Sequence, residues 1–312
     1  MCGIVGYVGK NQAPSILIDG LGKLEYRGYD SAGIAVFDGN EINIAKTKGR
    51  LSNLIKLLLE NPLSGTIGIG HTRWATHGAP SDTNSHPHIS EDHKIAVVHN
   101  GIIENYMDIK EELLKEGYHF LSETDTETIA HLIDYYYKES MDFEDSVFKA
   151  VSRLEGSYAL GIICKDSPDK LIAVRKGSPL VIGKGNGENF IASDIPALLN
   201  YTREVYFLEE EEIAVITDND ISIYDSNRNK IERDIYHVTW DIEAAEKSGY
   251  AHFMLKEIHE QPKIVRETIL KRLPETEDGI VLDNIKLSKQ ELENIDRIYV
   301  VACGTAYYAG LI

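Results

Sequence analysis

The order of the predicted strands and helices is the feature that most restricts the fold of this 312-residue chain. Apolar runs typical of strands come first, amphipathic helices follow near the middle, and strand-like runs return after Gly156. A doubly wound parallel sheet would instead alternate strand and helix along the chain. We therefore predict a layered α+β fold, in which two antiparallel sheets pack together and helices cover their outer faces.

The clearest helical pattern lies in the middle of the chain, where apolar residues recur at spacings of three and four. Thr124, followed three residues later by Glu127, has the spacing of a capping box for the first turn. Helices are also predicted at residues 13–24, 51–60, 106–116 and 147–154. The predicted strands are 4–9, 34–37, 42–45, 95–98, 158–164, 171–175, 181–182, 190–192, 205–208, 213–217 and 221–224.

The chain changes character after about residue 225, where charged residues become more frequent. A helical pattern over residues 251–273 contains Pro262, which predicts an interruption there. Residues 297–302 read as a buried strand that leads into a Gly-Thr turn, with too little chain after it to complete a domain. We expect residues 285–312 to be poorly fixed in isolation. The predicted divisions are a domain over 2–220, a linker over 221–285 and an incomplete domain over 286–312.

Charge and cysteine content restrict the environment and partners of the chain. The formal net charge is -18, which argues against nucleic acid or an anionic membrane as a partner, because phosphate binding needs clustered Lys and Arg. The three cysteines are far apart, so no disulfide framework is expected. The sequence shows neither a signal peptide nor an apolar run of roughly 18–20 residues that could span a membrane. A reducing cytoplasm is the expected location.

Cys2 is the first candidate for chemistry. If Met1 is removed, Cys2 carries both a thiol with an ordinary pKa of about 8.5 and an α-amine with one of about 7.7–8.0. A nucleophile and a general base would then be joined in one residue, and an N-terminal amine is a known activating base. The alternative is that Cys2 is only a small apolar residue at the start of a strand.

Three further positions could recognise a substrate. Arg73 has the planar fork that suits a carboxylate, although a surface salt bridge is an alternative. Asn100 and Gly101 could donate N–H groups to an oxyanion, but Asn-Gly also suits a turn at the end of a strand. Asp125 could accept an ammonium group, or could serve the start of its helix.

Two other patterns suggest a ligand, and neither is a good match. Six histidines fall between residues 71 and 99, but they lack the Cys/His pairings and the H-E-x-x-H pattern of zinc sites. The glycines of residues 183–187 match neither the dinucleotide fingerprint nor the Walker A pattern, and they suit a turn between strands. We expect no metal and no cofactor.

A thiol, an oxyanion hole, a carboxylate clamp and an ammonium acceptor are what is needed to bind a free amino acid and attack its side-chain carbonyl. Glutamine fits, and the products would be ammonia and a thioester. Two other hypotheses stay open. The first is a non-catalytic module that senses an amino acid through Arg73 and Asp125. The second is a Cys/His protease that uses one of the clustered histidines and tolerates an uncleaved Met1.

Five motifs extend this interpretation to a family. Together they closely resemble the class II glutamine amidotransferases, which are N-terminal nucleophile hydrolases with a four-layer αββα sandwich. The motifs are Cys-Gly-Ile-Val-Gly at 2–6, Leu-Glu-Tyr-Arg-Gly-Tyr-Asp-Ser-Ala-Gly at 24–33, His-Thr-Arg-Trp-Ala-Thr-His-Gly at 71–78, His-Asn-Gly-Ile-Ile-Glu-Asn at 99–105 and Ser-Glu-Thr-Asp-Thr-Glu at 122–127.

The resemblance implies a role for each candidate residue. Cys2 would be the nucleophile, with its own α-amine as the base, and Asn100 and Gly101 would form the oxyanion hole. Arg73 would bind the α-carboxylate of glutamine and Asp125 its α-amino group. The remaining implied site residues are Arg27, which would order the site beside Cys2, and Trp74, Thr76 and His77, which would line it on a closing loop, Trp74 also serving as the gate of an ammonia channel.

The end of the chain resembles those members of the family that continue into a sugar isomerase (SIS) domain. The matching stretches are residues 253–262 and residues 302–305, where Gly304 and Thr305 would begin a sugar-phosphate loop. Ala306 stands where the loop often has serine. The resemblance implies that a longer, homodimeric protein would pass ammonia to fructose 6-phosphate and form glucosamine 6-phosphate, and that this chain alone would only hydrolyse glutamine.

Overall fold

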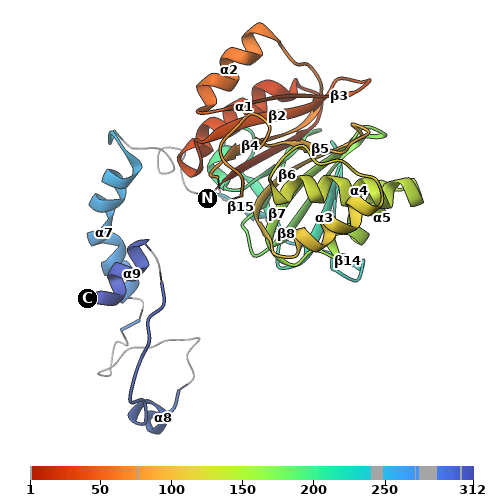
Figure 1. Ribbon diagram of the computed structural model, residues 1–312. Helices are drawn as coiled ribbons and strands as arrows, with labels where there is room; N and C mark the ends of the chain where they lie inside the picture. Colours follow the sequence, from red (N-terminus) through yellow and green to blue (C-terminus); the bar gives the residue numbers. More distant parts are fainter. Residues whose placement is uncertain (1, 76, 240–248, 271, 274–286, 303) are drawn as a thin grey trace. The chain divides into compact units, whose positions relative to one another are not determined.

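The structure is a computed structural model, and it describes residues 2–75, 77–239, 249–270, 272–273, 287–302 and 304–312. The chain divides into two compact units, Met1–Ile242 and Glu243–Ile312, and each is considered by itself. Figure 1 shows the first unit as packed sheets and helices. Its boundary lies beyond residue 220 because β13, β14 and β15 still pair with the two sheets.

Two antiparallel sheets form the centre of the first unit. The first sheet, in the described part of the chain, has eight strands in the order β15-β11-β9-β10-β1-β4-β2-β3. The bounds of its strands are β1 Gly3–Val8, β2 Ser31–Phe37, β3 Ile42–Lys48, β4 Ile67–Arg73, β9 Val181–Lys184, β10 Asn189–Ala192, β11 Glu204–Phe207 and β15 Tyr236–His237.

The second sheet has seven strands among the described residues, in the order β14-β13-β12-β8-β7-β6-β5. Long runs of β-branched and aliphatic residues in β6, β7 and β8 suit strands that are covered on both faces. The bounds are β5 His88–Ile89, β6 Ile95–Ile103, β7 Gly156–Cys164, β8 Ser167–Lys176, β12 Glu212–Ile216, β13 Ile221–Tyr224 and β14 Lys230–Ile231.

Helices cover the outer face of each sheet, which confirms the predicted α+β fold (Figure 1). The inner faces of the two sheets meet in one apolar cluster that includes Ile4, Ile69 and Leu171. A second cluster lies between the second sheet and its helices. The helices against the first sheet are α1 Ala13–Leu24 and α2 Leu51–Glu60. Those against the second sheet are α3 Tyr106–Lys115, α4 Asp125–Ser140 and α5 Phe143–Val151. Two short 3-10 helices are η1 Glu25–Arg27 and η2 Ile195–Ala197.

Strand β1 fixes the position of Cys2. It lies between β10 and β4 in the first sheet, and its registers pair Gly3 with Thr72 and Val5 with Ala192. Every residue of β1 is buried. Cys2 therefore lies directly at the end of a central strand, where hydrogen bonds on both sides hold the backbone in place.

Two details of the first unit differ from the sequence predictions. The Thr124 side chain makes no capping hydrogen bond to α4, because its hydroxyl lies 3.0 Å from the Nε2 atom of His88. The Glu127 carboxylate does not bond the Thr124 amide but accepts hydrogen bonds from the amides of Leu121 and Ser122, which precede it. The predicted strand 95–98 was also too short, because pairing with β7 continues to the end of β6, and the alternative of a strand-ending turn at Asn100 does not form.

The second unit differs from prediction as well. Its described helices are α7 Phe253–Leu270, α8 Lys289–Glu293 and α9 Gly304–Leu311, and α7 continues through Pro262. Residues 297–302 do not form the expected buried strand, since Val300 and Val301 are 59% and 95% exposed. A strand needs a neighbouring strand for its backbone hydrogen bonds, and the described residues offer none there. No described helix has the length and apolar character needed to cross a membrane.

The packing between the second sheet and its helices leads to a testable expectation. Leu160 of β7 is fully buried in this cluster, whereas Leu59 of α2 is 79% exposed. We expect Leu160→Ala to lower the free energy of unfolding by about 2–5 kcal/mol, because it leaves a cavity. The matched control Leu59→Ala should change it by no more than about 0.5 kcal/mol. Urea unfolding of both variants measures the difference, and equal losses would contradict this assignment of the core.

Candidate active site

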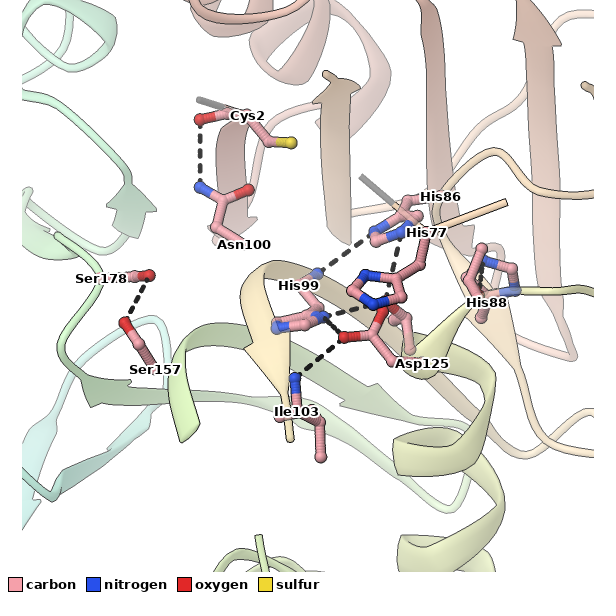
Figure 2. A network of polar contacts seen from close by, with 12 residues as sticks. Cys2, His77, His86, His88, His99, Asn100, Ile103, Asp125, Ser157 and Ser178 are labelled. Carbon is pink, nitrogen blue, oxygen red and sulfur yellow. Dashed lines mark hydrogen bonds and ion pairs between the residues drawn. The ribbon is translucent and has the colours of Figure 1, made fainter. Parts of the chain in front are cut away.

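The backbone and thiol of Cys2 are held by three different parts of the fold. Its carbonyl oxygen accepts hydrogen bonds from Arg27 Nε at 3.0 Å and from Asn100 Nδ2 at 3.1 Å. Its Sγ atom accepts one from the Trp74 amide at 3.1 Å. Figure 2 shows the Cys2 carbonyl facing the Asn100 amide. The site thus combines the start of β1, the end of β4, a residue inside β6 and η1, which are distant in sequence.

The thiol opens into a cavity of about 270 Å³ between these elements. Burial raises the pKa of Cys2, while the Trp74 amide and the charges of Arg73 and Arg27 oppose that rise. Met1 is outside the described residues. The residues that line the cavity are Cys2, Arg27, Arg73, Trp74, His77, His86, His99, Asn100, Gly101, Ile102, Thr124, Asp125, Thr126, Ser178 and Pro179.

Arg73 ends β4 and presents a buried cation to the cavity. Its Nη2 atom donates hydrogen bonds to the carbonyl oxygens of His77 and, at 3.0 Å, Gly78. Its Nη1 atom is buried and has no hydrogen-bond partner among the described residues. Burial lowers the pKa of Arg73, but a guanidinium stays charged in proteins. A buried unpartnered donor of this kind is costly, so a ligand carboxylate would satisfy it.

Asp125 presents a carboxylate to the same cavity from the first residue of α4. It is 4% exposed, and its Oδ2 atom accepts a hydrogen bond from the Ile103 amide at 3.0 Å. The same atom lies 3.9 Å from His99 Nδ1 (Figure 2). The rigid start of a helix and the neighbouring strand β6 therefore hold the carboxylate in a fixed orientation, in which it can accept a ligand ammonium group.

Asn100 and Gly101 are strand residues, and their geometry depends on close packing between β6 and β7. Gly101 has a φ of 122°, which favours glycine. A Cβ atom at this position would lie 1.9 Å from the carbonyl oxygen of Ser157. No other residue type fits here without moving the strand. The Asn100 amide donates to Ser193 Oγ at 2.8 Å as well as to the carbonyl oxygen of Cys2.

Four of the clustered histidines are buried together at the cavity, where His86 and His99 line it and His71 and His88 do not. The rings of His71 and His86 stack with centroids 4.2 Å apart, and His86 also lies edge-on to His88. Burial lowers the pKa of each of these rings and of His99, so all four are neutral near pH 7. The described residues contain no group of three or more His, Cys, Asp or Glu arranged to hold a metal ion.

The other predicted site residues are not all at the cavity: Trp74 and His77 line it, and Gly304 and Thr305 belong to the second unit. Trp74 is 45% exposed and its ring lies edge-on to Tyr29, and the ring of His77 lies edge-on to Tyr106. Thr76 lies outside the described residues. Gly304 begins α9 in the second unit, where Ala306 also lies. Thr305 belongs to the same helix, and its side chain lies outside the described part.

Sequence reasoning missed two site residues. Ser193 follows β10, and its hydroxyl accepts from both Asn100 Nδ2 and, at 2.8 Å, the Ile4 amide. Ser178 lines the cavity close to Ser157, at 3.4 Å between hydroxyls (Figure 2). A single serine far along the chain carries no local signal, and only sheet pairing brings Ser193 next to β1.

Comparison with known proteins agrees with this fold and site. Residues 71–200 match the family described as glutamine amidotransferase domain. The chain is similar to the glutamine phosphoribosylpyrophosphate amidotransferase of B. subtilis, with a TM-score of 0.63 and 29% identity over 73% of this chain and 50% of that one. Residues 71–200 are thus similar to a glutamine amidotransferase domain, and the two antiparallel sheets between helices are the four-layer fold expected of an N-terminal nucleophile hydrolase.

Curated relatives give a more particular match. The chain is 58% identical, over all of its 312 residues, to the glutamine–fructose-6-phosphate aminotransferase (isomerizing) of Clostridium perfringens, and 48% identical to that of Aquifex aeolicus. It covers 51% of each of these relatives. This chain therefore spans about half the length of the curated relatives that it matches.

The charges around Cys2 give an expectation for its reactivity. In the chain that keeps Met1, we expect the pH midpoint for alkylation of Cys2 by iodoacetamide to lie above about 8.5, because burial disfavours the thiolate. Arg73→Gln removes a charge that favours the thiolate, so the midpoint should rise further. Arg153→Gln, on the surface beside Glu112, is the control. Peptide mass spectrometry across pH measures both. A wild-type midpoint below that of free cysteine would contradict the expectation.

Proposed function

We propose that this chain, once Met1 is removed, hydrolyses L-glutamine to glutamate and ammonia. One observation supports this most strongly: a single cavity is lined by the Cys2 thiol, by an unpartnered donor of Arg73 and by the Asp125 carboxylate. The cation and the carboxylate suit the two charged groups of an α-amino acid. The thiol, beside the Asn100 amide, suits attack on the side-chain carbonyl of that amino acid.

The chemical steps follow from these groups. The α-amine of Cys2 takes the thiol proton, and the thiolate attacks the amide carbon of glutamine to form a C–S bond. The carbonyl oxygen becomes an oxyanion, which N–H groups of Asn100 and Gly101 would stabilise. The amine returns the proton to the leaving nitrogen, and the C–N bond breaks to release ammonia. Water then attacks the thioester, which yields glutamate and restores the thiol.

Removal of Met1 is essential in this scheme. While Met1 is present, the nitrogen of Cys2 belongs to a peptide bond and cannot accept a proton. Cys2 directly follows Met1, so cleavage of the peptide bond between them would free the α-amine of Cys2. The base would then be connected to the nucleophile through the Cα and Cβ atoms of a single residue, and no other side chain is needed to abstract the proton.

In a longer protein, we propose that the ammonia aminates fructose 6-phosphate to give glucosamine 6-phosphate. The printed name of the relatives, each about twice the length of this chain, supports this assignment. Gly304 and Thr305 would then belong to a sugar-phosphate loop of a sugar isomerase domain. Assembly as a homodimer, a cytoplasmic location and the absence of nucleic-acid and membrane partners stay predictions.

The role of Cys2 can be tested directly. We expect Cys2→Ala to abolish ammonia release from glutamine, because it removes the nucleophile. The matched control is Cys164→Ala, since Cys164 is buried in β7 and burial raises its pKa to about 11. That control should retain wild-type activity per folded molecule. An enzyme-coupled ammonia assay measures both variants, and residual turnover by Cys2→Ala equal to wild type would remove Cys2 from the mechanism.

The role of Asp125 can be tested with a modified substrate. Asp125→Asn keeps an oxygen that can accept from the Ile103 amide but removes the negative charge. We expect kcat/KM for glutamine to fall by about 10-fold or more, the size of a lost charged hydrogen bond. For 4-carbamoylbutanoate, which lacks the α-amino group, the value should change by less than about threefold, because this substrate has no ammonium to bind. Equal losses with both substrates would contradict the assignment.

A further inference from the structure

A buried histidine outside the cavity is connected to the proposed oxyanion hole. His71 of β4 is 1% exposed and does not line the cavity. Its Nε2 atom lies 3.0 Å from the carbonyl oxygen of His99 and 3.0 Å from Oδ1 of Asn100. This ring therefore contacts the oxygen of the Asn100 amide, whose nitrogen faces the carbonyl oxygen of Cys2.

The backbone determines which nitrogen of His71 carries the proton. The carbonyl oxygen of His99 can only accept a hydrogen bond, so Nε2 must be the donor. The other nitrogen, Nδ1, is buried without a hydrogen-bond partner among the described residues, which agrees with an unprotonated atom there. Burial also lowers the pKa of His71 to about 3, so near pH 7 the ring is neutral and holds one proton.

The proton on Nε2 in turn determines the orientation of the Asn100 amide. An N–H group on His71 requires an oxygen opposite it, so Oδ1 of Asn100 faces the ring and Nδ2 faces the other way. On that other side, the carbonyl oxygen of Cys2 and Oγ of Ser193 accept its two hydrogens. If the amide were flipped, a carbonyl would face the Cys2 carbonyl and an NH2 group would face the Nε2–H group.

We propose that His71 is a positioning residue for glutamine hydrolysis, which fixes the Asn100 amide so that its nitrogen, and not its oxygen, is on the side of Cys2. The proposal rests on the proposed function, because it concerns the oxyanion that forms when the thiolate attacks. A preorganised donor of this kind costs no reorientation during the reaction. Without the ring, the amide can turn, and its oxygen then faces the developing negative charge.

The first test compares two substitutions of His71 in the processed chain. His71→Leu removes the donor, and we expect kcat for glutamine to fall about 10- to 100-fold with KM within about threefold. His71→Gln supplies an N–H group at a similar reach and should recover most of kcat. The matched control is His131→Leu, another buried histidine that bonds the His119 carbonyl, and its kcat should stay within about twofold of wild type. Equal losses in the two His71 variants, or unchanged kcat in His71→Leu, would overturn the proposal.

The second test separates the oxyanion from the thiol. Iodoacetamide alkylates the thiolate by displacing iodide, and no oxyanion forms in that step. The alkylation rate of Cys2 in His71→Leu should therefore stay within about twofold of wild type. A rate that falls in parallel with kcat would show that the substitution damages the thiol itself, and it would overturn the proposal.

The third test asks whether His71 acts through Asn100. In an Asn100→Ala background, His71→Leu should reduce the remaining glutaminase kcat by less than about twofold, because the group that it positions is gone. A full additional loss would overturn the proposal.

A wild-type chain that lacks Met1 and releases no ammonia would contradict the proposed function. An active wild type with an unaffected His71→Leu variant would contradict only the role of His71.

Discussion

The site depends on how the fold anchors Cys2. Once Met1 is removed, as we propose, Cys2 would have a covalent neighbour on one side only, and its backbone would otherwise be free to move. Strand β1 lies between β10 and β4, which holds the chain up to Gly3 on both edges. Arg27 and Asn100 then hold the Cys2 carbonyl from two further directions. This anchoring fixes the position of the thiol in the cavity.

Burial gives the charged and polar groups of the cavity their chemical character. It raises the pKa of Cys2, keeps four histidines neutral and leaves one donor of Arg73 without a partner. In water each of these groups would be solvated, and the cost of an unpaired donor would vanish. The same exclusion of solvent makes a bound carboxylate or oxyanion more strongly stabilised in the cavity than it would be at the surface.

A hydrogen-bond chain runs behind the cavity from one backbone carbonyl to the nucleophile. The His99 carbonyl sets the proton on His71, that proton sets the orientation of Asn100, and Asn100 faces Cys2. Ser193 supports the same amide from the opposite sheet, through β10. Each group in this chain has one compatible orientation. The two sheets must therefore pack in their native arrangement before the Asn100 amide is positioned correctly.

The sequence alone determined the layered α+β fold, because hydrophobic spacing reports local structure, and it indicated Cys2, Arg73, Asn100 and Asp125 through the chemistry of their side chains. It could not show that β6 continues through Asn100, since an Asn-Gly pair reads locally as a turn and only pairing with β7 overrides that preference. Nor could it find Ser193 or assign the proton of His71, because those roles arise between residues that are far apart in the chain. Local sequence also predicted a buried strand at residues 297–302. No partner strand lies beside them among the described residues, and Val300 and Val301 are exposed.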